Sequence, residues 1–124
     1  MGYFNPGTKP GTHPEIIRYG EHLRAQGRSE ATVQNHMGYC RSFVAAVSHV
    51  DRDWQPRKIT RDTIVEFGRS LVRRGCRRST VQSEVGGAIG WVRWLAEQKK
   101  LDDSGFLTNC AVKDVVSTVM PNYR

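Results

Sequence analysis

Apolar side chains recur every three or four residues over most of the chain, a spacing that places them on one face of a helix. The two longest stripes each cover about four helical turns. They consist of Val33, Met37, Cys40, Val44 and Val47, and of Val81, Val85, Ala88, Val92 and Leu95. Two shorter stripes precede them, Ile16, Gly20 and Leu23, and Ile64, Phe67 and Leu71. The pattern predicts an all-α fold with four main helices.

Residues at the edges of these stripes predict where each helix begins and ends. The expected N-caps of the four helices are, in order, Thr12, Ser29, Thr60 and Ser79. Glu15 and Gln82 stand three residues after the first and last of them, which is the spacing of a capping box. We expect the first helix to end at Gly27, the second near residue 49, the third near Gly75 and the fourth near residue 100. A fifth, shorter helix is predicted over Leu107 to Met120.

One segment of the chain occurs twice. Residues 23–44 and 71–92 align without a gap at a constant offset of 48, which superimposes Gly27 on Gly75 and Thr32-Val33-Gln34 on Thr80-Val81-Gln82. A match at a fixed period indicates a duplicated supersecondary unit. Each copy reads as the end of one helix, a glycine turn and the start of a longer helix. The sequence therefore predicts two repeated helical hairpins.

The fourth predicted helix is apolar nearly all round, because Ile89, Trp91 and Trp94 lie outside its main stripe. Such a helix is expected at the centre of the fold. Small residues stand four apart in both long helices, Gly86 and Gly90 in the fourth, with Gly38 and Ser42 at the equivalent positions of the second. We expect these positions to allow close approach of a neighbouring helix backbone.

Size and composition narrow the classes of protein. A chain of 124 residues makes about one domain, and its apolar runs are far shorter than a membrane span requires. Its 3 cysteines are widely spaced, and its 4 histidines lack metal-ligand spacing. We therefore expect reduced thiols in a cytoplasmic protein, with no metal site and no cofactor.

Charge indicates the partner. Lys and Arg number 19 against 12 Asp and Glu, which gives a net charge of +7. Five arginines fall within residues 69–78, and no acidic residue stands between Glu66 and Glu84. Arginine forms forked contacts with phosphates and base edges. The excess favours a nucleic acid over a merely solvated basic surface.

Many of these residues, in their order and spacing, resemble the core-binding domain of tyrosine recombinases, the phage integrase family. The residues that carry the resemblance are Tyr19, Leu23, Gly27, Ser29, Thr32, Phe43, Ile59, Thr60, Gly75, Ser79, Thr80, Val81, Trp91, Trp94, Leu95 and Leu101. The segment Leu107-Thr108-Asn109-Cys110-Ala111 is similar to the linker of that family, with Cys110 in place of a proline. The resemblance covers about residues 13 to 120.

The resemblance implies a four-helix, SAM-like bundle over residues 13–101 that grips double-stranded DNA at a recombination site. Residues 102–124 are then a linker toward a catalytic domain that this chain lacks. Residues 1–12 are expected to be a flexible tail, because the first eleven residues include two prolines and three glycines. His49-Val-Asp-Arg52 matches one motif of that catalytic domain in letters only, at the end of a helix without its partners. We expect no catalytic residue and no DNA cleavage by this chain alone. The implied location is the nucleoid of a prokaryotic cell, with a monomeric isolated domain and a full-length recombinase that assembles on DNA.

The candidate DNA-binding residues gather at the starts of the second and fourth helices, where free N–H groups and the helix dipole favour phosphate. They are Arg28, Ser29, Thr32, Gln34, Asn35, Arg77, Arg78, Ser79, Thr80, Gln82 and Ser83. Secondary candidates are Lys58, Arg61, Arg73, Arg74 and Arg93. The amides are the expected readers of base edges, and the arginines and hydroxyls the expected phosphate contacts.

Two other classes stay open at this point. One is a stand-alone accessory or regulatory DNA-binding protein, which a reading frame ending at Arg124 would favour. The other is an all-helical protein–protein adaptor, for which we expect no response to DNA and a partner interface that involves Trp91 or Trp94. A free-standing enzyme is disfavoured, because no acid–base pair, nucleophile triad, phosphate loop or metal cluster is evident in the sequence.

Overall fold

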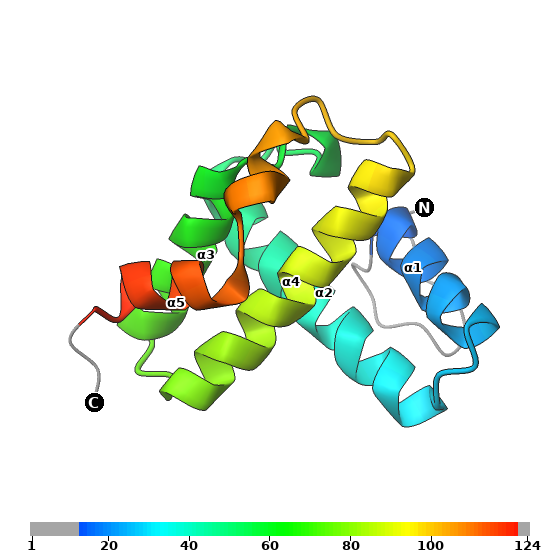
Figure 1. Cartoon of the computed structure of the whole chain (residues 1–124), viewed down its shortest axis with the longest axis horizontal. Helices are drawn as coiled ribbons and strands as arrows, with labels where there is room; N and C mark the ends of the chain where they lie inside the picture. Colours follow the sequence, from blue (N-terminus) through cyan, green and yellow to red (C-terminus); the bar gives the residue numbers. More distant parts are fainter. Residues whose placement is uncertain (1–12, 122–124) are drawn as a thin grey trace.

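The computed structural model describes residues 13–121, and their regular structure is entirely helical (Figure 1). The five α-helices are α1 (Pro14–Ala25), α2 (Glu30–Val50), α3 (Arg61–Arg73), α4 (Arg78–Glu97) and α5 (Val112–Val119). Two short 3-10 helices, η1 (Pro56–Lys58) and η2 (Gly105–Asn109), lie in the connections. The all-α prediction is confirmed for these residues, while the SAM-like arrangement stays a prediction. The predicted tail, residues 1–12, lies outside the described residues.

The two glycine turns have the same local structure. Gly27 and Gly75 adopt the left-handed conformation, with φ of +84° and +80°. In the first turn the Arg28 N–H donates to the Leu23 carbonyl at 3.2 Å, and in the second the Cys76 N–H donates to the Leu71 carbonyl at 3.1 Å. Both turns are therefore Schellman motifs, in which glycine avoids the cost of a left-handed side chain. The predicted repeat of two hairpins is present at the level of individual hydrogen bonds.

The core lies between α2 and α4, which cross near their middles (Figure 1). Helix α4 packs against all four other α-helices, and the whole of its predicted stripe is buried, as are Ile89, Trp91 and Trp94. Its predicted central place is confirmed. In α2 the stripe is shifted: Phe43 is fully buried, whereas Val44 and Val47 are only half-buried. The Phe43 ring packs edge-on against Phe67, Trp91 and Trp54.

Close packing requires glycine at positions that only partly agree with the predicted ones. A Cβ atom on Gly87 would lie 2.4 Å from Cδ2 of Tyr39, whereas one on Gly86 would lie 3.7 Å from its nearest neighbour, a methyl of Val112. A Cβ on Gly90 would lie 3.3 Å from the hydroxyl oxygen of Tyr19. The prediction of close backbone approach at Gly86 was therefore wrong by one residue, and the group that approaches is a side chain.

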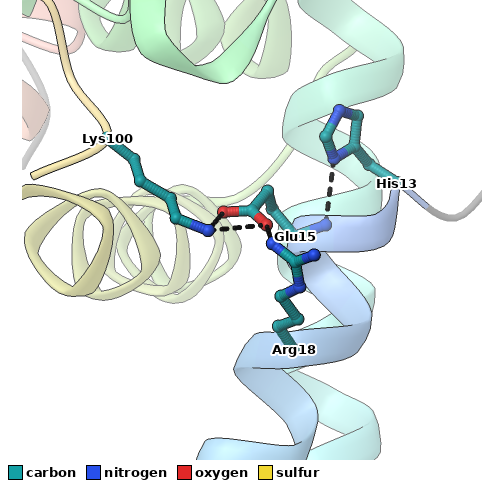
Figure 2. A network of polar contacts seen from close by, with 4 residues as sticks. All are labelled: His13, Glu15, Arg18 and Lys100. Atoms are coloured by element: carbon teal, nitrogen blue, oxygen red, sulfur yellow. Dashed lines mark hydrogen bonds and ion pairs between the residues drawn. The ribbon is translucent and has the colours of Figure 1, made fainter. Parts of the chain in front are cut away.

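Helix α1 begins one residue later than predicted. Thr12 lies outside the described residues, and the N-cap is His13, whose Nδ1 accepts a hydrogen bond from the Glu15 N–H at 3.1 Å. The Glu15 side chain does not complete a capping box. Figure 2 shows that its carboxylate instead meets Arg18 and Lys100, with Lys100 Nζ 2.9 Å from Glu15 Oε2. This ion pair ties the start of α1 to the residues that follow α4.

The C-terminal part of the chain is not one helix. The predicted helix over Leu107 to Met120 is broken, because η2 ends at Asn109 and α5 starts only at Val112. Cys110 at the break is buried, and Val115 and Val116 of α5 are fully buried against α3 and α4. The division at residue 101 stays a prediction, but the hydrophobic core continues past it.

Candidate nucleic-acid interface

The two glycine turns lie on the same side of the molecule, at its two lower corners in Figure 1. Helix α2 rises from the α1–α2 turn and α4 from the α3–α4 turn, so the starts of both helices diverge from the crossing. Eleven predicted site residues occupy these starts, and all are exposed except the half-buried Thr32 and Arg78. The fold therefore brings the two predicted groups to one side but leaves them at separate ends of it.

The start of α2 is a capped and internally paired helix end. The Ser29 Oγ accepts from the Thr32 N–H at 3.2 Å and donates to the Thr32 hydroxyl at 2.9 Å, so its predicted capping role is confirmed. Glu30 accepts two hydrogen bonds from Arg24, at 2.8 and 2.9 Å, and one from Gln34 at 3.0 Å. The hydrogen bonds from Arg24 and then Gln34 lower the pKa of Glu30 to about 2. Gln34 is thus engaged within the protein, while Arg28 and Asn35 extend from this end.

The start of α4 differs, because it lacks a side-chain cap. The predicted cap, Ser79, was wrong: the helix begins at Arg78, and Arg77 is the N-cap with φ −69° and ψ 158°. Arg77 is the repeat equivalent of Ser29, so the turn geometry fixes the cap position although the residue there cannot accept a hydrogen bond. The predicted box with Gln82 is likewise absent. The first backbone N–H groups of α4 therefore have no capping side chain as acceptor, and Arg77 and Arg78 lie beside them. This arrangement suits an anion.

Alanine substitution of the two serines tests this difference. We expect Ser29→Ala to lower the free energy of unfolding by about 1 kcal/mol, because it removes the acceptor of the Thr32 N–H. Ser79→Ala is the matched control, and we expect a change of less than about 0.5 kcal/mol at this exposed position. Urea unfolding of the three proteins measures both values. Equal losses in the two variants would contradict the assignment of Arg77 as the cap.

A hollow of about 500 Å³ lies along α2, with one residue of α4 at its edge. Its lining residues are Gln34, Asn35, Gly38, Tyr39, Arg41, Ser42 and Glu84. Only Gln34 and Asn35 were predicted from the sequence as site residues, and the other five were not. For Tyr39 the sequence did contain a signal. The offset of 48 aligns this large residue with Gly87, and a large residue opposite a small one is typical of a close contact between two helices.

Glu84 is a half-buried acid of α4 that borders this hollow. One carboxylate oxygen, Oε2, is buried without a hydrogen-bond partner. Burial raises the pKa of Glu84 above its ordinary value of 4.5, although the hydroxyl of Ser42 and the guanidinium of Arg74 act in the opposite direction. At the repeat-equivalent position, burial and then Arg28 lower the pKa of His36, whose Nδ1 also lacks a partner. In both groups burial shifts the pKa toward the neutral form.

Replacing Glu84 by glutamine should stabilise the fold in a pH-dependent way. A raised pKa in the folded state means that the protonated carboxyl contributes stability below pH 4.5, and that this contribution is lost as the pH rises through the folded pKa. We therefore expect Glu84→Gln to be more stable than the native chain at pH 7.5, with the difference shrinking at pH 4. Urea unfolding at the two pH values provides the comparison. A difference that is unchanged between them would contradict the raised pKa.

The secondary cations divide into two groups. Arg73 and Arg74 lie beside the second turn, at the end of α3. Lys58 lies near the C-terminal end of α2, where its Nζ donates to the Asp53 carbonyl at 3.3 Å. Arg61 starts α3, and Arg93 donates to the Cys110 carbonyl at 3.4 Å. The structure thus places Arg73 and Arg74 near the second turn, although Arg73 also lines, with Lys58, the hollow at the end of α2. Arg61 and Arg93 lie on other parts of α3 and α4.

Other classes of site find little support among residues 13–121. No group of three or more His, Cys, Asp or Glu side chains is placed to hold a metal ion there. Of the helices in that range, none has the length and apolar character to cross a lipid bilayer. Comparisons with protein-family models, with curated proteins and with solved structures gave no match for this chain. The recombinase resemblance accordingly stays a prediction.

Proposed function

We propose that this chain binds double-stranded DNA as the core-binding domain of a site-specific tyrosine recombinase, and that strand cutting belongs to a separate catalytic domain. The observation that carries the proposal is the pair of repeated Schellman turns on one side of the fold. Each turn leads into a helix start with arginine beside it, Arg28 in one and Arg77 and Arg78 in the other. Helix starts and arginines are both suited to phosphate.

Charge distribution supports the same partner. Arg73 and Arg74 adjoin the second turn, and the chain as a whole carries +7. Along α2, Asn35 and Arg41 line a hollow in which base edges could be contacted. The arrangement offers phosphate contacts at the two turns and polar side chains along α2.

An NMR titration of the labelled protein with a short duplex at low salt tests the proposal. We expect amide shifts to cluster at residues 28–36 and 77–83, with little change in α5. Shifts elsewhere, or no shifts at all at low salt, would contradict a DNA-binding role for this surface.

One observation favours the adaptor as a second candidate. Val50 is 87% exposed, and it borders a cavity of about 400 Å³ lined by Val47, Trp54 and Phe67. Apolar hollows of this kind accept a partner's side chain. The interface would then lie at the end of α2 and along α3 as far as Arg73, and it would not involve the predicted Trp91 and Trp94, which are buried. The same NMR titration separates the two candidates, because an adaptor would not respond to DNA.

A further inference from the structure

Residues at equivalent positions of the two hairpins contact each other where α2 and α4 cross. Tyr39 of α2 lies directly over Gly87 of α4, so close that a Cβ on the glycine would fall 2.5 Å from the Tyr39 Cβ. One turn further on, the rings of Phe43 and Trp91 pack edge to face with centroids 6.3 Å apart. In both pairs the two residues are 48 positions apart, which is the offset of the repeat.

Contacts between equivalent residues are expected at a two-fold axis. Repeats related by simple translation would also place equivalent residues together, but α2 and α4 would then run side by side. Figure 1 shows instead that the two helices cross and that their starts diverge toward opposite corners. An axis that bisects the crossing, vertical in Figure 1, exchanges α2 with α4 and one turn with the other. The axis leaves the molecule between the two turns.

Duplex DNA has a matching symmetry, because its antiparallel backbones are related by two-fold axes perpendicular to the helix. Two-fold proteins commonly align with such axes. The crossing lies nine residues after the first residue of each helix, Glu30 to Tyr39 and Arg78 to Gly87. Each arm is therefore about 14 Å long, and the two helix starts are at most about 27 Å apart. That span can reach both sides of a major groove about 12 Å wide.

We propose that the domain binds with its pseudo-two-fold axis on a two-fold axis of the duplex, so that the two turns contact phosphates of opposite strands. This inference rests on the proposed DNA-binding function. The two halves are not identical in charge. In the first half Glu30 is paired with Arg24, whereas the equivalent of Glu30 in the second half is Arg78. The second turn is therefore the stronger phosphate contact.

A duplex with one neutral strand tests the inference without knowledge of the target sequence. The probe is a short duplex in which every phosphate of one strand is replaced by a methylphosphonate. Because binding releases counterions from DNA, the logarithm of the binding constant falls linearly with the logarithm of the salt concentration. The steepness of this fall, the salt slope, measures the number of phosphates that the protein contacts. A domain that contacts both strands should lose the contribution of the weaker first turn, so its salt slope should be smaller by about 0.9 than on the fully charged duplex. A domain that follows a single strand would choose the charged one and keep its full slope, which would overturn the inference.

Two single variants sharpen the result. On the half-neutral duplex the second turn should take the charged strand, so Arg77→Ala should lower the slope by about 0.9 and Arg28→Ala should leave it unchanged. On the fully charged duplex both variants should lower it. Equal losses on the half-neutral duplex would overturn the assignment of the turns to opposite strands. Absence of binding to the fully charged duplex at low salt would instead reject the proposed function itself.

Discussion

Replacing Gly87 by alanine is expected to lower the free energy of unfolding by about 3 kcal/mol, at the upper end of the usual cost of overpacking a core. The added methyl group would lie 2.4 Å from Cδ2 and 2.5 Å from Cβ of Tyr39. Because the Tyr39 Cβ is attached directly to the α2 backbone, a change of rotamer cannot relieve the contact. The two central helices would have to move apart.

The neighbouring glycine is the control. A Cβ on Gly86 would meet only a methyl of Val112 at 3.7 Å, which is an ordinary contact. Gly86→Ala should therefore gain helix propensity and stabilise the fold, by up to about 1 kcal/mol. Urea unfolding of the two variants measures the opposite effects. A Gly87→Ala protein as stable as the native chain would show that the crossing is looser than the structure describes.

The second large effect is expected in DNA binding. Removing both arginines at the start of α4, by Arg77→Ala with Arg78→Ala, should lower the salt slope by about 1.8. Near 0.1 M salt this corresponds to a loss of affinity on the order of 60-fold. Because phosphate contacts do not discriminate between sequences, the loss should be similar for unrelated duplexes. Fluorescence anisotropy over a series of salt concentrations gives both quantities.

A control of equal charge separates a local contact from the general field of the protein. Arg52→Ala with Arg57→Ala removes the same two charges from the connection between α2 and α3, where both residues are exposed. We expect this variant to keep nearly the native salt slope. If the two double variants lose the same amount, the contribution of Arg77 and Arg78 is net charge rather than position.

The helices and their repeat could be predicted from the sequence because each depends on local patterns. The stripe of α4, the glycine turns and the Ser29 cap all follow from residues within one or two turns of each other. The prediction of Ser79 as the cap was wrong because it followed the capping preference of serine and not the repeat. The offset of 48 places Arg77, and not Ser79, opposite Ser29. The geometry of the glycine turn, and not the type of side chain, sets the position of the cap.

The rest of the candidate site could not be predicted in the same way. The hollow with Arg41 and Glu84 exists only because α2 and α4 cross at Tyr39 and Gly87. A crossing point depends on packing between residues that are distant in sequence, and a helical stripe leaves it undetermined. Only the pairing of a large and a small residue at equivalent positions of the repeat gave a sign of it.

The packing of α5 has a consequence for where this chain can be shortened. Val115 and Val119 lie against Gly68 of α3, and Val112 lies near Gly86 of α4. A truncation after Leu101 would open these faces of α3 and α4 to water and remove two fully buried valines, Val115 and Val116, from the core. The smallest fragment that keeps the observed packing therefore extends to the end of α5.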